Sequence, residues 1–289
     1  MKRIYLFSIS ICLLLSSGLY SQEGESDLQD AFSAYNPIYF IVGTGDLVKT
    51  RLLDESSQWG KEIETDQMVK LSFSMKYQFF HQYKTGLYLG FTQDMFWDLF
   101  YESSPFSELN YNPDLFLRFE SENNFASDLD MGVLDYVQIG TEHKSNGLAG
   151  IQSRGFDRVY GQLQLKFGDR SNAVLNAKYY VFYQDFLPSW YEPEIPDLPE
   201  YRSSWEFRTE VNLDLGWAFF LPHTIRITAS PGGGANSFDF LKGYQQLDVI
   251  FGDVFGGMCP YVQIWNGYGE GLIAYDQYIL SIRAGILLR

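Results

Sequence analysis

The sequence predicts an all-β protein, a twelve-stranded antiparallel transmembrane β-barrel. Three observations support this prediction. A secretory signal peptide opens the chain, apolar and polar residues alternate over long runs, and aromatic residues make up 18% of the 289 residues. Barrels of this kind consist of alternating segments of about 10 residues separated by turns, and they carry aromatic residues where the strands meet the two membrane–water interfaces.

Residues 1–21 have the three parts of a secretory signal peptide. Lys2 and Arg3 follow the first Met, Ile4–Leu15 is a short apolar run, and small residues lead up to a cleavage site after Ser21, with Gly18 as the alternative. This run is shorter than the ~20 residues that a spanning helix needs, and an uncleaved anchor is the alternative. The mature domain would be residues 22–289. Its only cysteine is Cys259, which excludes an internal disulfide and a cysteine-based zinc module.

Two stretches show the strand pattern most clearly. In Met68–Gln78 the odd positions are apolar, and in Ser204–Leu215 apolar residues alternate with charged or amide residues. Alternation at period two places the two kinds of residue on opposite faces of a strand. Runs of this length match a tilted membrane-spanning strand of about 9–11 residues. Strands of soluble sheets average about 5–6 residues, so a soluble all-β domain is the weaker alternative.

The remaining strands follow from the same pattern. Leu187–Pro199 contains four prolines and Pro231–Ser237 contains three consecutive glycines, so both are expected to be loops. One feature departs from the barrel pattern, because the chain ends at Leu288–Arg289 and not on an aromatic residue. The twelve strands are expected to start near Ile38, Met68, Thr85, Pro113, Val133, Phe156, Ala173, Ser204, His223, Tyr244, Pro260 and Gln277.

The charge balance excludes one class of partner. The chain has 36 acidic and 21 basic side chains, for a formal net charge of −15. A protein that binds nucleic acid needs a basic face to neutralise phosphates, so no nucleic-acid partner is expected. A hydrophobic content of 46% also excludes general disorder.

One predicted hairpin carries the candidate chemistry. Strand Val133–Ser145 leads into a loop of small residues, Asn146–Gln152, and strand Ser153–Phe167 returns. His143 and Ser145 are two positions apart, which places both side chains on one face of the first strand.

A symmetric pairing of this hairpin brings a third group to the same face. If the loop is centred near residue 150, His143 lies opposite Asp157 and Ser145 lies opposite Gly155. Cross-strand Cβ atoms are about 5 Å apart, which allows a carboxylate–imidazole hydrogen bond. Serine needs a neighbouring base to remove its proton, and that base needs an acceptor to orient it. A shift of one residue would destroy this arrangement, and ordinary polar residues at a strand end are the alternative.

The motifs of this hairpin resemble those of the bacterial outer-membrane phospholipase A family. The family pattern His-x-Ser-Asn-Gly stands at His143–Gly147, and Ser-Arg-x-aromatic-Asn/Asp-Arg-x-Tyr stands at Ser153–Tyr160. Two further blocks within Ser103–Leu117 and Gly267–Tyr275 are similar, as is Thr92–Gln93. The blocks follow the family order and cover most of the mature chain.

This resemblance implies a calcium-dependent phospholipase of the A1/A2 and lysophospholipase type, active as a homodimer. It would hydrolyse acyl ester bonds of membrane phospholipids in the outer membrane of a Gram-negative-type bacterium. Ser145 is then the nucleophile and His143 the general base and acid. Asp157 takes the third place, where the best-known relatives have Asn, and its charge would alter the pH profile. The main-chain N–H of Gly147 matches the oxyanion donor of the family.

The resemblance also implies a calcium ion (Ca²⁺) beside these residues at the dimer interface. Its ligands would be the main-chain carbonyl of Leu148, the hydroxyl of Ser153 and Ser103 of the partner subunit. All three are oxygen ligands, as a hard cation requires. Leu148 stands where the family usually has Arg, a change that a main-chain ligand tolerates. Gln93 matches a wall position where an amide pair between subunits would direct dimerisation, and no organic cofactor is expected.

The predicted location of the triad is the outside of the barrel, near the outer leaflet. A lipid could then reach Ser145 without leaving the membrane. The competing class is a non-enzymatic barrel, such as a small porin or a catalytically silent relative. The two classes differ in what Ser145→Ala would do, because only the enzyme would lose an activity.

Overall fold

The computed structural model describes residues 31–44, 51–52, 63–64, 69–99, 103–121, 133–187, 195–234 and 236–289. The chain divides into two compact units, Met1–Phe32 and Ser33–Arg289. The second unit holds the twelve-stranded sheet described below. The predicted signal peptide, residues 1–21, lies outside the described residues.

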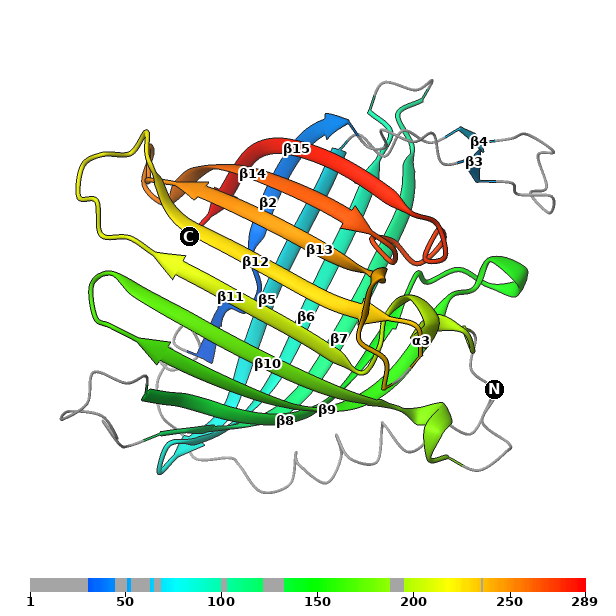
Figure 1. Cartoon of the computed structure of the whole chain (residues 1–289), viewed down its shortest axis with the longest axis horizontal. Coiled ribbons are helices and arrows are strands. Elements are labelled where there is room, and N and C mark those ends of the chain that lie inside the picture. Colours follow the sequence, from blue (N-terminus) through cyan, green and yellow to red (C-terminus); the bar gives the residue numbers. More distant parts are fainter. Residues whose placement is uncertain are drawn as a thin grey trace, which may run out of the picture. The chain divides into compact units, whose positions relative to one another are not determined.

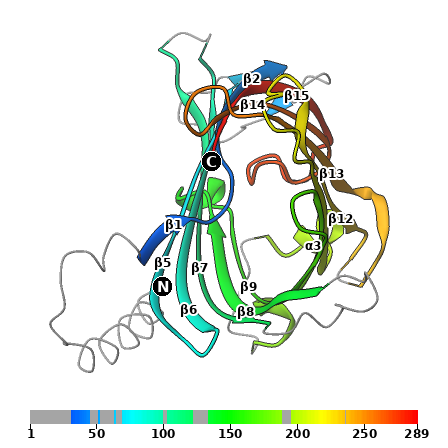
Figure 2. The ribbon, with the colours of Figure 1, turned by 90° about the vertical axis from the view of Figure 1, so that its left-hand side faces the viewer.

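Twelve antiparallel strands of the second unit form a closed barrel. Each strand pairs with the next one along the sheet, β15 pairs with β2, and β2 pairs with β5, which closes the ring (Figures 1 and 2). Three short strands, β1 (Phe32–Ala34), β3 (Arg51–Leu52) and β4 (Ile63–Glu64), are not counted among the twelve. The twelve are β2 (Ile38–Thr44), β5 (Val69–Gln82), β6 (Thr85–Trp97), β7 (Phe106–Glu120), β8 (Val133–Ser145), β9 (Gly155–Phe167), β10 (Asn172–Phe182), β11 (Trp205–Asn212), β12 (Pro222–Gly232), β13 (Asp239–Phe251), β14 (Met258–Gly267) and β15 (Ile279–Leu288).

The predicted barrel is confirmed, and two of the predicted strand starts are wrong. Strand β7 begins at Phe106 and runs through Pro113, where the sequence predicted its start. Strand β13 begins at Asp239 and not near Tyr244, because Gly232 of β12 still pairs with Asp239 across an irregularity in the ladder. The last strand pairs on both sides despite the Leu288–Arg289 ending.

Residues of the wall alternate between an apolar outside and a polar inside. This is the pattern of a barrel whose outer surface faces lipid, because charged side chains on that surface are costly. Six of the apolar side chains that point outward are 40% to 58% exposed: Phe40, Leu89, Ile139, Leu163, Ile227 and Ile282. Six of the polar or charged side chains that point inward are at most 5% exposed: Lys70, Glu142, Arg158, Asp248, Gln263 and Arg283.

The two ends of the barrel differ in their connections. At one end a tight turn at Tyr83–Lys84, where both residues have positive φ, joins β5 to β6. Longer connections stand at the other end, including 98–105, 146–154 and 268–278. Barrels of the outer membrane have short periplasmic turns and longer extracellular loops, so the candidate hairpin loop lies at the extracellular end. No helix in the described part of the chain has the length and apolar character that crossing a membrane requires.

The loop between β14 and β15 is anchored to the inner wall. Its Glu270 contacts Lys70 at 3.1 Å and Arg283 at 2.5 Å. Burial alone would raise the pKa of the Glu270 carboxyl, but the charges of Arg283 and Lys70 lower it below its usual value. Glu108 of β7 also accepts hydrogen bonds from the main-chain N–H groups of Leu272 and Ile273.

A small apolar cluster joins this loop to the candidate hairpin. The cluster includes Leu198 of the short helix α3 (Leu198–Tyr201), labelled in Figure 1, and Ile195 just before it. Leu272 of the loop packs in the same cluster with Phe156 of β9. The β14–β15 loop and helix α3 therefore pack beside the hairpin at the extracellular end of the barrel.

Candidate active site

The strand pairing of the hairpin has the predicted register. His143 lies opposite Asp157, and Ser145 lies opposite Gly155. The Nδ1 atom of His143 is 2.9 Å from Oδ1 of Asp157, which is a hydrogen bond between the two side chains. The carboxylate therefore holds the imidazole in a fixed orientation.

The imidazole–carboxylate pair lies on the outer face of the barrel. The side chain of His143 is 45% exposed and that of Asp157 is 34% exposed. Ile139 on β8 and Leu163 on β9 lie an even number of residues from His143 and Asp157, so they share the same strand faces. Both are exposed apolar residues of the outer wall. The histidine, the carboxylate and Ser145 thus share the lipid-facing surface, as predicted.

Ser145 belongs to a row of outward-facing residues that crosses several strands. Starting from β5, the paired positions are Phe73, Gln93, Tyr111, Ser145 and Gly155. Gln93 therefore lies at the same height on the wall as Ser145, with only Tyr111 between them. This row connects the wall position predicted for dimer contact to the candidate nucleophile.

Asn146 organises the loop that follows Ser145. Its side chain is buried, and its Nδ2 donates to the carbonyl of Gln152 at 2.8 Å. Its Oδ1 accepts from the main-chain N–H groups of Leu148 at 3.2 Å and Arg154 at 3.0 Å. One buried amide thus ties both ends of the loop together, and removing it would leave several main-chain groups without partners.

The position of Gly147 favours glycine. Its φ is +68°, a conformation that favours glycine, and a Cβ atom there would lie 2.8 Å from the Tyr111 ring. Gly147 follows Ser145 by two positions, so its main-chain N–H lies near the start of the loop. The Tyr111 ring lies close to Gly147 on the outer wall beside the candidate nucleophile.

An interruption in the ladder is repaired beside His143. Pro113 has no N–H to donate, and the pairing of β7 with β8 skips from Tyr111 to Asp114. The side-chain amide of Asn112 donates to the main-chain carbonyl of His143 at 2.9 Å. The histidine backbone is therefore held from both neighbouring strands.

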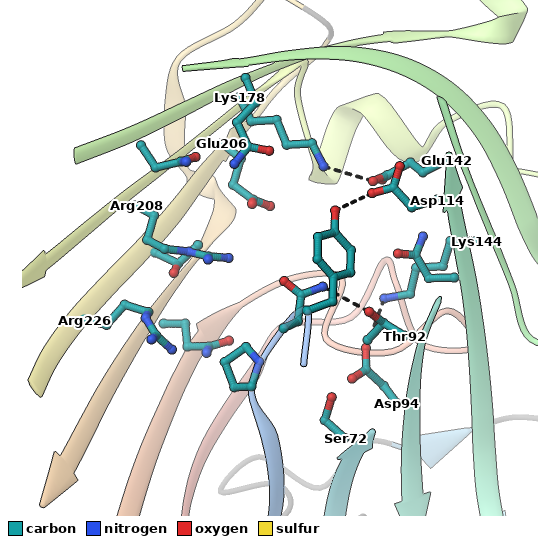
Figure 3. Close-up of a pocket in the computed structure, with 18 of the residues that line it drawn as sticks. Ser72, Thr92, Asp94, Asp114, Glu142, Lys144, Lys178, Glu206, Arg208 and Arg226 are labelled. Atoms are coloured by element: carbon teal, nitrogen blue, oxygen red, sulfur yellow. Dashed lines mark hydrogen bonds and ion pairs between the residues drawn. The ribbon is translucent and has the colours of Figure 1, made fainter. Parts of the chain in front are cut away.

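The inner face of the same hairpin carries a buried ion-pair network. Glu142 lies opposite Arg158, one ladder position from the His143–Asp157 pair, and their side chains are in contact. Lys178 of β10 contacts Glu142 at 3.0 Å (Figure 3). A buried carboxylate needs such partners, because losing one leaves an uncompensated charge in the interior.

The interior cavity is separate from the candidate site. It has a volume of about 270 Å³, and Glu142 and Lys144 reach it from the hairpin (Figure 3). His143, Ser145 and Asp157 do not line it. Along β8, Glu142 and Lys144 therefore face the interior cavity, while His143 and Ser145 face the outside of the barrel.

The residues predicted to bind calcium lie in two loops. Leu148 and Ser153 belong to the loop that Asn146 organises, next to Ser145. Ser103 lies in the β6–β7 connection, where it has a positive φ of +66° and is exposed. Among the residues that the structure describes, no group of three or more His, Cys, Asp or Glu side chains could hold a metal ion. One chain therefore offers neutral oxygen atoms here and no cage of carboxylates.

Comparison with known proteins identifies the family. The family model described as Phospholipase A1 matches residues 15–288, almost the whole chain. The chain belongs to the phospholipase A1 family. As a member of this family it is a phospholipase, and its closed barrel places it in the outer membrane.

Relatives of this phospholipase cover most of its length. Phospholipase A1 of Klebsiella pneumoniae is 28% identical over 256 residues, which cover 85% of this chain and 77% of the relative. Phospholipase A1 of Escherichia coli strain K12 is 26% identical over 265 residues, covering 88% and 80%.

Two solved structures share the fold of the phospholipase. Outer membrane phospholipase A from Escherichia coli superposes with a TM-score of 0.71 at 24% identity, covering 89% of this chain and 98% of that one. The Salmonella typhi outer membrane phospholipase, a dimer with bound calcium, gives a TM-score of 0.71 at 23% identity, covering 93% and 94%.

Several residues that shape the site were not predicted as functional. Asn146 stands inside the first motif, so its place between Ser145 and Gly147 was the available signal. The hydrogen bond from Asn112 to His143 had no such signal, because it depends on the gap that Pro113 leaves in the ladder.

Proposed function

We propose that this phospholipase hydrolyses acyl ester bonds by transferring the acyl group to Ser145. The observation that carries this proposal is the His143–Asp157 hydrogen bond, which lies on the lipid-facing surface with Ser145 on the same strand face. A nucleophile, a base and a group that orients the base are the parts that acyl transfer needs.

Each group of this chain has one task in the reaction. Nε2 of His143 takes the proton of the Ser145 hydroxyl as its oxygen attacks the ester carbonyl. Asp157 accepts a hydrogen bond from Nδ1 and stabilises the charged imidazole that forms. The main-chain N–H of Gly147 donates to the oxyanion of the tetrahedral intermediate. His143 then protonates the leaving alcohol, and a water activated by the same nitrogen releases the fatty acid from Ser145.

Calcium fits the oxygen atoms around this site, and one chain supplies only part of a coordination shell. The Leu148 carbonyl and the Ser153 hydroxyl belong to the loop organised by Asn146, and calcium prefers about 6–8 such oxygen ligands. Ser103 of the partner subunit and water would complete the shell. When bound, the ion would supply positive charge that stabilises the oxyanion.

A homodimer is the proposed active form. Gln93 and Ser145 lie in one outward-facing row, so a partner packed against β6 would also stand close to the nucleophile. The Salmonella typhi relative is a dimer with bound calcium, which supports the same arrangement here.

The porin alternative receives less support from the barrel interior. Glu270 bridges Lys70 and Arg283 inside the wall, and Leu272 packs against Phe156 at the extracellular end. A porin needs a water-filled channel, and these contacts cross the inside of the barrel beside its cavity.

The test is phospholipid hydrolysis by protein refolded in detergent, first with calcium and then with EDTA. We expect calcium-dependent release of fatty acid from the natural sequence and none from Ser145→Ala. Ser171→Ala, at the opposite end of the barrel, is the matched control and should keep full activity. No release from a folded dimer would contradict the proposed chemistry, and conductance in planar bilayers would favour the porin.

A further inference from the structure

A pair of aromatic residues lies beside the candidate triad on the outer face. Residues Tyr183 and Phe186 follow the end of β10, within and just after a short 3-10 turn (Tyr183–Asp185). The ring of Phe186 packs edge-on against that of Tyr183, with 5.3 Å between centroids. We call these two residues the aromatic ledge.

The ledge is fixed to the strand that carries His143. The hydroxyl of Tyr183 lies 2.7 Å from Oγ1 of Thr141, two residues before His143 on the same face of β8. Because β9 lies between β8 and β10, the Tyr183 side chain has to cross the outer face of β9 to make this contact. The ring therefore covers β9 next to Asp157.

The strand pairing gives the height of the ledge on the wall. Phe182 lies opposite Arg158, so Tyr183 follows at the height of Asp157. Main-chain hydrogen bonds from Phe186 at 3.2 Å and Leu187 at 2.9 Å return to the carbonyl of Tyr183 and hold the turn. The ledge is thus a preformed surface at the triad.

The ledge and the proposed dimer contact lie on opposite sides of the triad. Along the sheet the strands run β6, β7, β8, β9, β10, with Gln93 on β6 and Tyr183 after β10. A partner on the Gln93 side leaves the ledge side open to lipid. Phe186 is 51% exposed, which suits a contact with an acyl chain.

We propose that the aromatic ledge binds the acyl chain that stays on the phospholipid while the other chain is cleaved at Ser145. This inference rests on the proposed function and adds a residue pair that distinguishes diacyl from monoacyl substrates. An apolar ring surface gains stability by covering the chain, and the hydrogen bond to Thr141 keeps Tyr183 in place before lipid arrives.

The experiment compares kcat/KM for a diacyl phospholipid and for its monoacyl form, with one headgroup, in mixed micelles with calcium. Tyr183→Ala and Phe186→Ala should each lower the diacyl value roughly tenfold, as expected for the loss of a well-packed aromatic contact. The monoacyl value should change less than about twofold, because that substrate lacks the second chain.

Two further variants sharpen the result. Tyr183→Phe and Thr141→Val both remove the anchoring hydrogen bond while keeping the ring, and each should lower the diacyl value by roughly threefold. Phe119→Ala, which removes an exposed outer-wall aromatic residue far from the triad, should change neither value.

The outcomes separate this inference from the proposed function. If both substrates are cleaved in a Ser145-dependent manner and Tyr183→Ala leaves their ratio unchanged, the ledge is not a binding surface for the second chain. If the natural sequence cleaves neither substrate, the proposed function fails and the ledge proposal fails with it.

Discussion

The two faces of the β8–β9 hairpin are built on opposite principles. The outer face holds the half-exposed His143–Asp157 pair at 2.9 Å. The inner face holds Glu142 and Arg158 one ladder position away, and both are about 5% exposed. Strand alternation lets neighbouring residues serve these two purposes, because successive side chains point to opposite faces.

This difference indicates which contacts hold the two strands of the hairpin in place. The imidazole of His143 is 45% exposed, so about half of its surface faces away from the protein. The buried contacts among Glu142, Arg158 and Lys178, together with the ring of Tyr180 at 3.4 Å from the Arg158 guanidinium, fix the same two strands from behind. The chemistry proposed for the outer face would therefore rely on rigidity supplied from the inner face.

Removing the base should have the largest effect on the outer face. His143→Ala should lower kcat by about 10⁴-fold, because the serine loses its proton acceptor. Thermal unfolding should be unchanged, since the side chain is half-exposed. His81→Ala, at a strand end away from the site, is the control for histidine loss. Activity within tenfold of the natural sequence would contradict the assignment of His143.

Breaking the inner network should instead lower stability. Arg158→Met leaves Glu142 buried with fewer partners, and we expect about 3–5 kcal/mol loss in the free energy of unfolding. Denaturant titration of the refolded protein measures this loss. An unchanged unfolding midpoint in the single variant would show that the network does not support the hairpin.

The Asn146 amide ties the two ends of the loop together, and its removal should show an intermediate effect. Asn146→Ala removes the side-chain hydrogen bonds to Gln152, Leu148 and Arg154, worth on the order of 1 kcal/mol each. Activity should fall by roughly tenfold to a hundredfold as Gly147 loses its position. Asn212→Ala, on β11, serves as the matched amide control. Loss of stability without loss of activity would speak against a role in orienting the loop.

The smallest expected effect concerns the carboxylate itself. Asp157→Asn keeps an acceptor for Nδ1 of His143 but removes the negative charge beside it. The acid limb of the pH–activity profile should move to lower pH by roughly one unit, since a partly exposed ion pair is worth on the order of 1 kcal/mol. A profile that does not move would mean that the Asp charge is fully screened by solvent.

The outer face of the hairpin could be predicted from the sequence, and much of the inner face could not. A symmetric loop gives the pairing of His143 with Asp157, and the motif residues identify which pair matters. The contact of Lys178 with Glu142 depends on how far a long side chain reaches across the interior from β10. The alternation of apolar and polar residues in the sequence does not predict such a contact.

Strand ends show the same limit. The sequence predicts a strand start near Pro113, yet β7 begins at Phe106 and continues through this proline. The Asn112 amide donates to the carbonyl of His143 beside this gap, and only the folded strands reveal that contact. The Tyr183–Thr141 hydrogen bond likewise spans three strands and has no local signal.

The most direct test of the central claim is covalent labelling of the nucleophile on the outer face. The refolded protein is treated with an alkyl fluorophosphonate in the presence of calcium, and the modified peptide is identified by mass spectrometry. We predict one label on Ser145, which is lost in His143→Ala although the barrel remains folded. Labelling of another serine, or equal labelling of Ser145 without His143, would contradict the account.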